Sequence, residues 1–166
     1  MMTEQARPLK RDPHLKAVSR DHHHGLLLCW KIREGFKRNI DVQRIKRYAD
    51  WFWTTHLIDH FAVEEKYIFS ILGIDNALVR KALSEHRRLK RLFSDNTEVW
   101  RSLNLIEEEL DKHIRFEERV LFNEVQKAAT AEQLALVEKH HNHHTHCDDW
   151  DDEFWVDPVA VSTEKK

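Results

Sequence analysis

The chain has 166 residues, of which 34% are charged and 13 are histidines, and its formal net charge is −2. This length allows one domain with a sizeable core, and the small net charge gives no electrostatic argument for nucleic acid as a partner. No apolar run has the length of a membrane span, no signal-peptide core is recognisable and two cysteines do not make a disulfide framework, so we expect a cytoplasmic protein without membrane contact.

The first half of the chain favours two long helices. Residues 1–13 are polar and contain two prolines, so we expect a flexible N-terminus. Apolar residues at helical spacing then predict a helix from about residue 14 to residue 38. Asp41 is a suitable N-cap for a second helix, and Gly73 is a suitable residue to end it. No proline interrupts either stretch, which permits helices of this length.

The second half begins with another pair of helices. Asp75 would be the N-cap of a third helix, and the polar segment 94–97 is the expected break before a fourth helix that ends near Lys127. Thr130-x-x-Gln133 is a capping-box pattern that opens a short fifth helix, which should reach about His140. No segment has the pattern of a strand. Because the connections are short, neighbouring long helices should be antiparallel.

These elements predict an all-α fold. We expect an antiparallel up-down-up-down four-helix bundle over residues 14–128, and a short helix with a His/Asp-rich polar tail over residues 129–166. Trp150, Phe154 and Trp155 suggest that part of the tail docks on the bundle. We interpret the rest as a solvated tail with adventitious metal affinity. Its histidines are His140, His141, His143, His144 and His146.

One pattern occurs twice in the chain. Residues 60–69 and residues 113–122 both read His-apolar-x-x-Glu-Glu-basic-x-aliphatic-Phe. On a helix, residues four apart lie on the same face, so each copy presents an imidazole and a carboxylate to one point. The two pairs are His60 with Glu64, and His113 with Glu117. A pseudo-twofold axis that brought the pairs together would create a two-metal site inside a four-helix bundle.

Burial strengthens this interpretation. A single buried histidine is usually a satisfied core residue, but a buried glutamate is rare unless it is paired or binds a metal. Two helices that each bury both residues at the same spacing therefore favour a metal site. The second glutamate of each doublet, Glu65 or Glu118, points about 100° further round the helix. We expect these two at the surface or in contact with the ligands.

The first and third helices should complete the site. The third helix contains one histidine, His86, which is in register with its apolar residues and follows Glu85. The first helix offers a parallel dipeptide, Asp21-His22, followed directly by His23. His22 falls in the apolar stripe and is our preferred ligand. His23 gives a second possible alignment, so it stays a candidate.

The predicted ligand set indicates the metal. We expect His22 and His60 on one ion, His86 and His113 on the other, and Glu64 and Glu117 bridging the two. Imidazoles with carboxylates suit iron and could accept manganese or zinc. Structural zinc sites are usually rich in thiolate, which is lacking in this set. We therefore expect two non-haem iron ions with a position left open for O2, NO or peroxide.

The spacing of these residues resembles that of the hemerythrin-like family, also called the HHE cation-binding domain. The family pattern is a His on helix one, His-x-x-x-Glu on helix two, a His on helix three and His-x-x-x-Glu on helix four, and the resemblance covers about residues 14–127. It implies an antiparallel four-helix bundle around a non-haem di-iron centre. Oxygen-carrying members have a further His four residues after the helix-three His, where this chain has Lys90. The remaining set of four His and two Glu is similar to that of iron–sulfur-cluster repair proteins and of an iron-sensing domain in a ubiquitin ligase.

Three kinds of function agree with such a site. Our leading prediction is a di-iron binding protein that binds or senses O2, NO or iron. The alternative is a di-iron enzyme of stress defence that reduces peroxide or NO or repairs iron–sulfur clusters. A third possibility is a zinc or manganese site that only stabilises the bundle. The sequence shows no Gly-rich phosphate loop and no nucleophile elbow that would indicate a different reaction.

Overall fold

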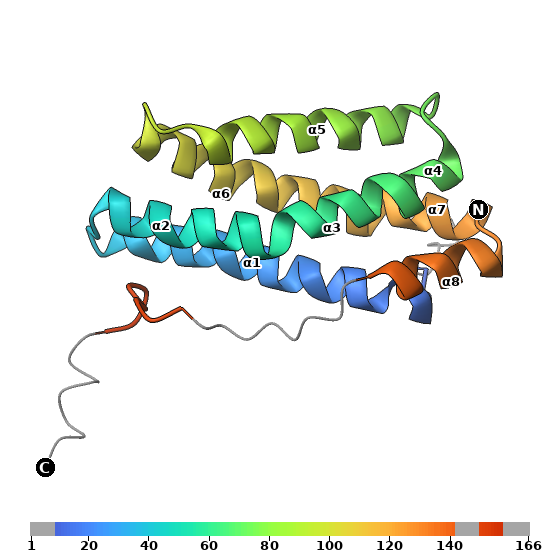
Figure 1. Ribbon diagram of the computed structural model, residues 1–166, viewed down its shortest axis with the longest axis horizontal. Coiled ribbons are helices and arrows are strands. Elements are labelled where there is room, and N and C mark those ends of the chain that lie inside the picture. The colour runs from blue at the N-terminus through green and yellow to red at the C-terminus, as the bar shows by residue number, and fades with distance from the viewer. Residues whose placement is uncertain (1–8, 142–149, 158–166) are drawn as a thin grey trace, which may run out of the picture.

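The computed structural model describes residues 9–141 and 150–157, and every regular element within these ranges is helical (Figure 1). The all-α class expected from the sequence is therefore confirmed for this part of the chain. The predictions for His143, His144 and His146 fall outside the described residues. No helix in the described part is both long and apolar enough to cross a bilayer.

The helices form five continuous stretches. The first comprises the 3-10 turn η1 (Pro13–Leu15) and α1 (Lys16–Lys37). The second comprises α2 (Val42–Phe52), the π-helical turn η2 (Trp53–Leu57), α3 (Ile58–Val63), the π-helical turn η3 (Glu64–Ile68) and α4 (Phe69–Leu72). The third is α5 (Ala77–Ser94). The fourth comprises α6 (Val99–Phe116), the π-helical turn η4 (Glu117–Leu121) and α7 (Phe122–Ala128), and the fifth is α8 (Ala131–His140).

Capping residues mark where these stretches begin and end. The side chain of Asp41 accepts a hydrogen bond from a backbone N–H of the first turn of α2, and Gly73 ends α4 with a φ of 87° that suits glycine. Both predictions are confirmed, as is the capping box at Thr130. The predicted cap of the third helix is wrong by one residue. Asn76, not Asp75, caps α5, because its side chain accepts hydrogen bonds from the first turn.

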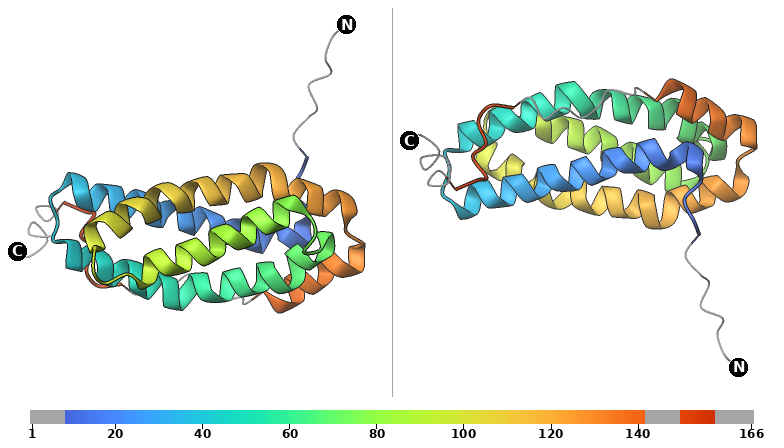
Figure 2. Two further views of the ribbon diagram at one scale, coloured as in Figure 1. Left: turned by 90° about the horizontal axis from the view of Figure 1, so that it is seen from above. Right: turned by 90° about the horizontal axis from the view of Figure 1, so that it is seen from below.

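The first four stretches lie side by side with short connections between them (Figures 1 and 2). α1 packs against α2 and α6, and α5 packs against α6. α8 lies at one end of the molecule, where it contacts η1 and η3 (Figure 2).

Two apolar clusters fill the interior at opposite ends. The first, which we call the α2 cluster, contains Ile45, Tyr48, Phe52, Leu103 and Leu110 among others. The second, which we call the α8 cluster, contains Leu15, Phe69, Phe122, Leu134 and Val137 among others.

The C-terminal segment 150–157 docks on the α2 cluster, as the sequence suggested. Phe154 and Trp155 are buried and belong to that cluster. Their rings lie 5.9 and 5.0 Å from the ring of Tyr48, centroid to centroid. An ion pair between Arg44 and Asp152 at 2.6 Å holds the outer side of the segment.

Candidate metal centre

All four long stretches contribute buried polar residues to a layer between the two apolar clusters. Along α1, for example, Val18 belongs to the α8 cluster, His22 to the polar layer and Leu28 to the α2 cluster. The layer consists of the six residues preferred as ligands, namely His22, His60, Glu64, His86, His113 and Glu117, and none is more than 7% exposed. The sequence therefore identified a group of residues that do converge in space.

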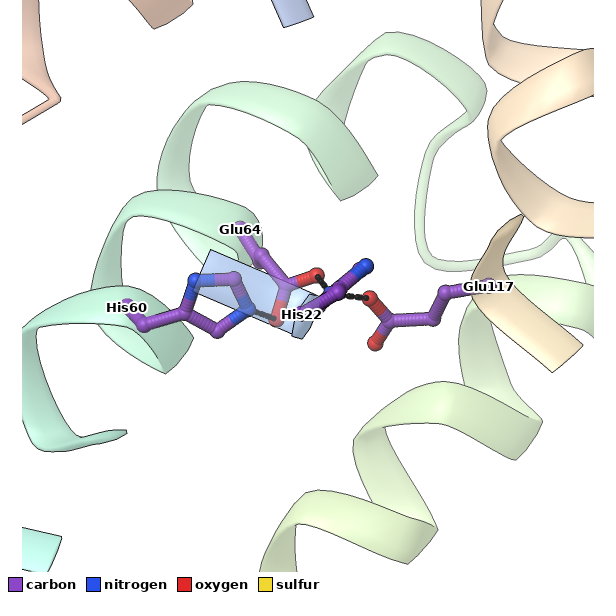
Figure 3. A group of neighbouring side chains, drawn as sticks. All are labelled: His22, His60, Glu64 and Glu117. Atoms are coloured by element: carbon purple, nitrogen blue, oxygen red, sulfur yellow. Dashed lines mark ion pairs between the residues drawn. The ribbon is translucent and has the colours of Figure 1, made fainter. Parts of the chain in front are cut away.

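The ring nitrogens and carboxylate oxygens of these residues form two groups that could each hold a metal ion. One contains His22 and His60, and the other contains His86 and His113. Glu64 and Glu117 belong to both groups. Figure 3 shows the first group, in which the two imidazoles and the two carboxylates point toward one another.

Distances between the ligand atoms show how closely the two groups are joined. Glu117 Oε2 lies 3.2 Å from His22 Nε2, and Glu117 Oε1 lies 3.4 Å from His86 Nε2. Glu64 makes the corresponding approaches, with Oε2 3.5 Å from His22 Nε2 and Oε1 3.4 Å from His86 Nε2. Each carboxylate therefore faces an imidazole of both groups, as a bridging ligand must.

The π-helical turns position the carboxylates and a ring behind each group. η3 begins at Glu64 and η4 begins at Glu117, and in each turn the N–H five residues on donates to the glutamate carbonyl. That fifth residue is the phenylalanine that closes the repeat. Phe69 lies 5.3 Å from the His86 ring, and Phe122 lies 5.3 Å from the His22 ring. The sequence pattern did not predict these turns, although π turns often mark functional sites.

The hydrogen bonding of the layer is incomplete without a further group. Seven atoms that face its centre form ion pairs with one another but make no hydrogen bond of regular geometry among the described residues. They are Nε2 of His22, His86 and His113, and both carboxylate oxygens of Glu64 and Glu117. These atoms approach only atoms of the same layer, imidazole to carboxylate, so their charges lie buried in a single cluster with no group elsewhere in the described part of the chain to pair with them. Cations at the centre would satisfy all of them, and the nitrogen and oxygen donors fit iron, manganese or zinc.

Three outer carboxylates orient the imidazoles from behind. Each accepts a hydrogen bond from the Nδ1 of a ligand histidine on another helical stretch, which leaves Nε2 facing the centre. The pairs are Glu118 with His22 at 2.6 Å, Asp21 with His60 at 3.0 Å, and Glu85 with His113 at 2.9 Å. Carboxylate partners of this kind fix the ring and increase its basicity in metal sites.

The same contacts shift the pKa values of the buried groups. Burial lowers the pKa of His60, but the charge of the adjacent Glu64 and the hydrogen bond to Asp21 outweigh it and raise the pKa to about 9. Burial raises the pKa of Glu117, but the charge of His113 and the close contact with His22 hold it well below its ordinary value. The carboxylates therefore stay ionised, and the imidazoles have a high affinity for protons or for another cation.

The structure separates the two candidates on α1. His22 is buried in the layer, whereas His23 is exposed and its ring contacts His24 at 5.7 Å. The reason is the rotation of about 100° per residue, which turns neighbouring helical side chains to different faces. Lys90, four residues after His86, is also exposed.

Two contacts of the layer were not anticipated from the sequence. His141, assigned to the solvated tail, instead has a nearly buried side chain whose Nε2 lies 2.7 Å from Asp21 Oδ2, the oxygen that also accepts from His60. Arg11, assigned to the flexible N-terminus, donates to the carboxylate of Glu118 at 3.1 Å. Arg11 precedes the first helix and His141 follows α8, so the helical spacing of the sequence could not indicate that either residue reaches the layer.

Comparisons of the chain with family models, with curated proteins and with solved structures give no significant match.

Proposed function

We propose that this chain is a hemerythrin-like protein, in which an antiparallel up-down-up-down four-helix bundle holds two non-haem iron ions and binds or senses O2, NO or iron. The observation that carries the proposal is the convergence of four buried imidazoles and two buried carboxylates, whose inward-facing atoms are paired only with one another among the described residues. The family resemblance of the repeat supports iron over the other metals that the donor set accepts.

In this proposal each residue of the layer has a defined role. His22 and His60 would hold one ion, His86 and His113 the other, and Glu64 and Glu117 would bridge them. When bound, an iron pair supplies open positions to which a diatomic ligand or peroxide can bind. The outer carboxylates keep Nδ1 protonated and Nε2 directed inward.

Aromatic rings shield the imidazoles of the layer. Phe61 stacks on His86 at 3.8 Å, and Phe69 and Phe122 lie beside His86 and His22. Such rings limit the access of water and lower the local dielectric, which strengthens charge interactions within the layer.

The proposal is tested by the metal content of the protein expressed without added metal. We expect about two iron ions per chain and an optical spectrum of a non-haem iron pair. His113→Ala should lose metal, whereas the matched control His23→Ala, which alters an exposed histidine, should retain it. Equal metal content in the two variants, or a wild-type protein without metal, would refute the proposal.

A second measurement addresses the ligand. The reduced protein should change its spectrum on addition of NO or O2 under otherwise anaerobic conditions. Continuous turnover of peroxide or NO would instead assign the protein to the di-iron enzymes of stress defence. A protein that purifies with zinc and shows no response to either gas would indicate a structural site.

A further inference from the structure

The duplicated site allows its two halves to be compared residue by residue. Glu65 and Glu118 occupy the same place in the two copies of the repeat. Glu118 faces His22 of α1, and Glu65 faces His86 of α5, so the two pairs are equivalent. His22 Nδ1 lies 2.6 Å from Glu118, but His86 Nδ1 lies 3.7 Å from Glu65, beyond hydrogen-bond length. His86 is only 4% exposed, and its Nδ1 has no hydrogen-bond partner within the described residues. One of the four imidazoles therefore has its outer carboxylate at ion-pair distance rather than at the hydrogen-bond length of the other three.

The same histidine lines a surface pocket of about 370 Å³. Trp53, Ile58 and Phe61 form its apolar wall, and Arg87 and Lys90 bring two cationic side chains to it. Trp53 belongs to η2, a π-helical turn to which the metal layer gives no role. The pocket thus combines an apolar wall, two cations and a buried imidazole nitrogen without a hydrogen-bond partner among the described residues.

Sequence differences between the halves account for the pocket. Ala62, which lines it, corresponds in the repeat to Arg115, whose longer side chain pairs with Asp111 at 2.7 Å. Glu118 is held by Arg11 as well as by His22, whereas the equivalent Glu65 has a side chain that is 46% exposed. A short side chain and a loosely held carboxylate leave space beside His86.

The groups around this space favour an anion. With Nε2 directed at a metal ion, the proton of His86 is on Nδ1, which is then a hydrogen-bond donor. Arg87 and Lys90 are also donors only, and Glu65 is the single carboxylate among the lining residues. The aromatic wall suits a flat apolar body.

We propose that this pocket binds a small organic carboxylate with a flat apolar body. Its carboxylate accepts a hydrogen bond from His86 Nδ1 and pairs with Arg87 and Lys90, while its body lies against Trp53 and Phe61. The ligand thereby does for His86 what Glu118 does for His22. The inference rests on the proposed function only for the position of the proton on His86.

Benzoate is a suitable probe, and the protein loaded with zinc, which is diamagnetic, is a suitable sample. Calorimetry should show saturable binding of benzoate, with binding of neutral benzamide about tenfold weaker because a charge-assisted contact is lost. In a sample with ¹⁵N-labelled histidine, benzoate should shift the Nδ1 resonance of His86. The resonance of His22 Nδ1, which already has an acceptor, should not move.

Variants locate the binding. Ala62→Phe should abolish it by filling the pocket, whereas Ala135→Phe, the same change at an exposed position on α8, should leave it intact. Lys90→Gln should weaken benzoate about tenfold, and this variant decides the matter if Ala62→Phe does not fold. Glu65→Gln should strengthen binding, because the competing negative charge is removed.

The outcomes separate this inference from the proposed function. Benzoate binding that persists in Ala62→Phe, or a His86 Nδ1 resonance that stays in place at saturation, would overturn the pocket. The proposed function would be refuted by a different result, namely that the wild-type protein retains no metal ion. A protein that binds metal but not benzoate would refute only the present inference.

Discussion

Replacing Glu117 by glutamine tests whether the two metal groups share one carboxylate. The substitution keeps the shape of the side chain but removes its charge and one acceptor oxygen. Glu117 Oε1 faces His86 at 3.4 Å, and Oε2 faces His22 at 3.2 Å, so the carboxylate lies beside imidazoles of both groups. Glu117→Gln should therefore cost the protein more than one ion per chain.

The size of the effect on stability follows from mass action. An ion that binds only the folded protein contributes about 2.7 kcal/mol when its free concentration is about 100 times its Kd. Two such ions contribute about 5 kcal/mol, and for a chain of this size each kcal/mol changes Tm by about 2–4 °C. We therefore expect the metal-dependent part of the melting temperature, about 10–20 °C, to be largely lost in Glu117→Gln.

The assay combines elemental analysis with thermal unfolding, each with and without a chelator. Glu108→Gln is the matched control, because Glu108 lies at the surface of α6, in the same helical stretch as Glu117, and pairs with Lys112 at 2.9 Å. The control should keep its metal and its melting temperature. Loss of a single ion in Glu117→Gln would show that the carboxylate serves one group only, and retention of both ions would show that it serves neither.

Three further predictions concern protonation, the outer carboxylates and packing. Because the pKa of His60 is about 9, protons compete with metal up to that pH, and apparent metal affinity measured against a chelator should rise from pH 6.5 to about 9. The free energy of unfolding of the metal-free protein should instead fall as pH rises. The stabilisation from His60 is complete below its unfolded pKa of about 6.5 and is lost as pH rises through about 9. Glu118→Gln should weaken one ion only, by about 10–100-fold in a metal titration, and an equal effect on both ions would contradict its assignment to a single imidazole. Gly35→Ala should destabilise the protein by about 1–2 kcal/mol in chemical unfolding, because the new Cβ would lie 2.6 Å from Ile45 Cδ1. This overpacking outweighs the gain in helix propensity. An unchanged stability would show that the Ile45 side chain moves aside freely.

Helix positions were largely predictable from the sequence because their signals are local. Capping residues and a positive-φ glycine act within one turn, and Asp41, Gly73 and Thr130 each mark a true boundary. The cap of α5 was misplaced because Asp75 and Asn76 are adjacent and almost equally good caps. The π turns were missed because an apolar stripe averaged over a long helix tolerates one additional residue in a turn.

The inward-facing residues were predictable for a different reason. A spacing of His and Glu that occurs on two helices is best explained if both pairs face one shared site. His86 on α5 was then identified because it is in register with the apolar residues of its helix. The choice between His22 and His23 needed the structure, because the apolar stripe of α1 admitted two alignments. The outer carboxylates also needed it. Asp21 and Glu85 reach histidines on other helices, and such contacts depend on helix packing, which residue spacing does not encode.

Position 90 links the family resemblance to the pocket. In the oxygen-carrying members of the family proposed for this chain, this position supplies an additional imidazole. Here it supplies Lys90, which is exposed and lines the pocket beside His86. With a metal ion on Nε2, Nδ1 of His86 would carry the proton, and the adjacent cation would attract an anion there rather than add a ligand for the metal. Lys90 therefore lies in the half where the outer carboxylate, Glu65, stands 3.7 Å from its imidazole, beyond hydrogen-bond length. In the proposed carboxylate pocket the two features would act together, since the lysine supplies positive charge and the distant Glu65 leaves Nδ1 of His86 open to an external acceptor.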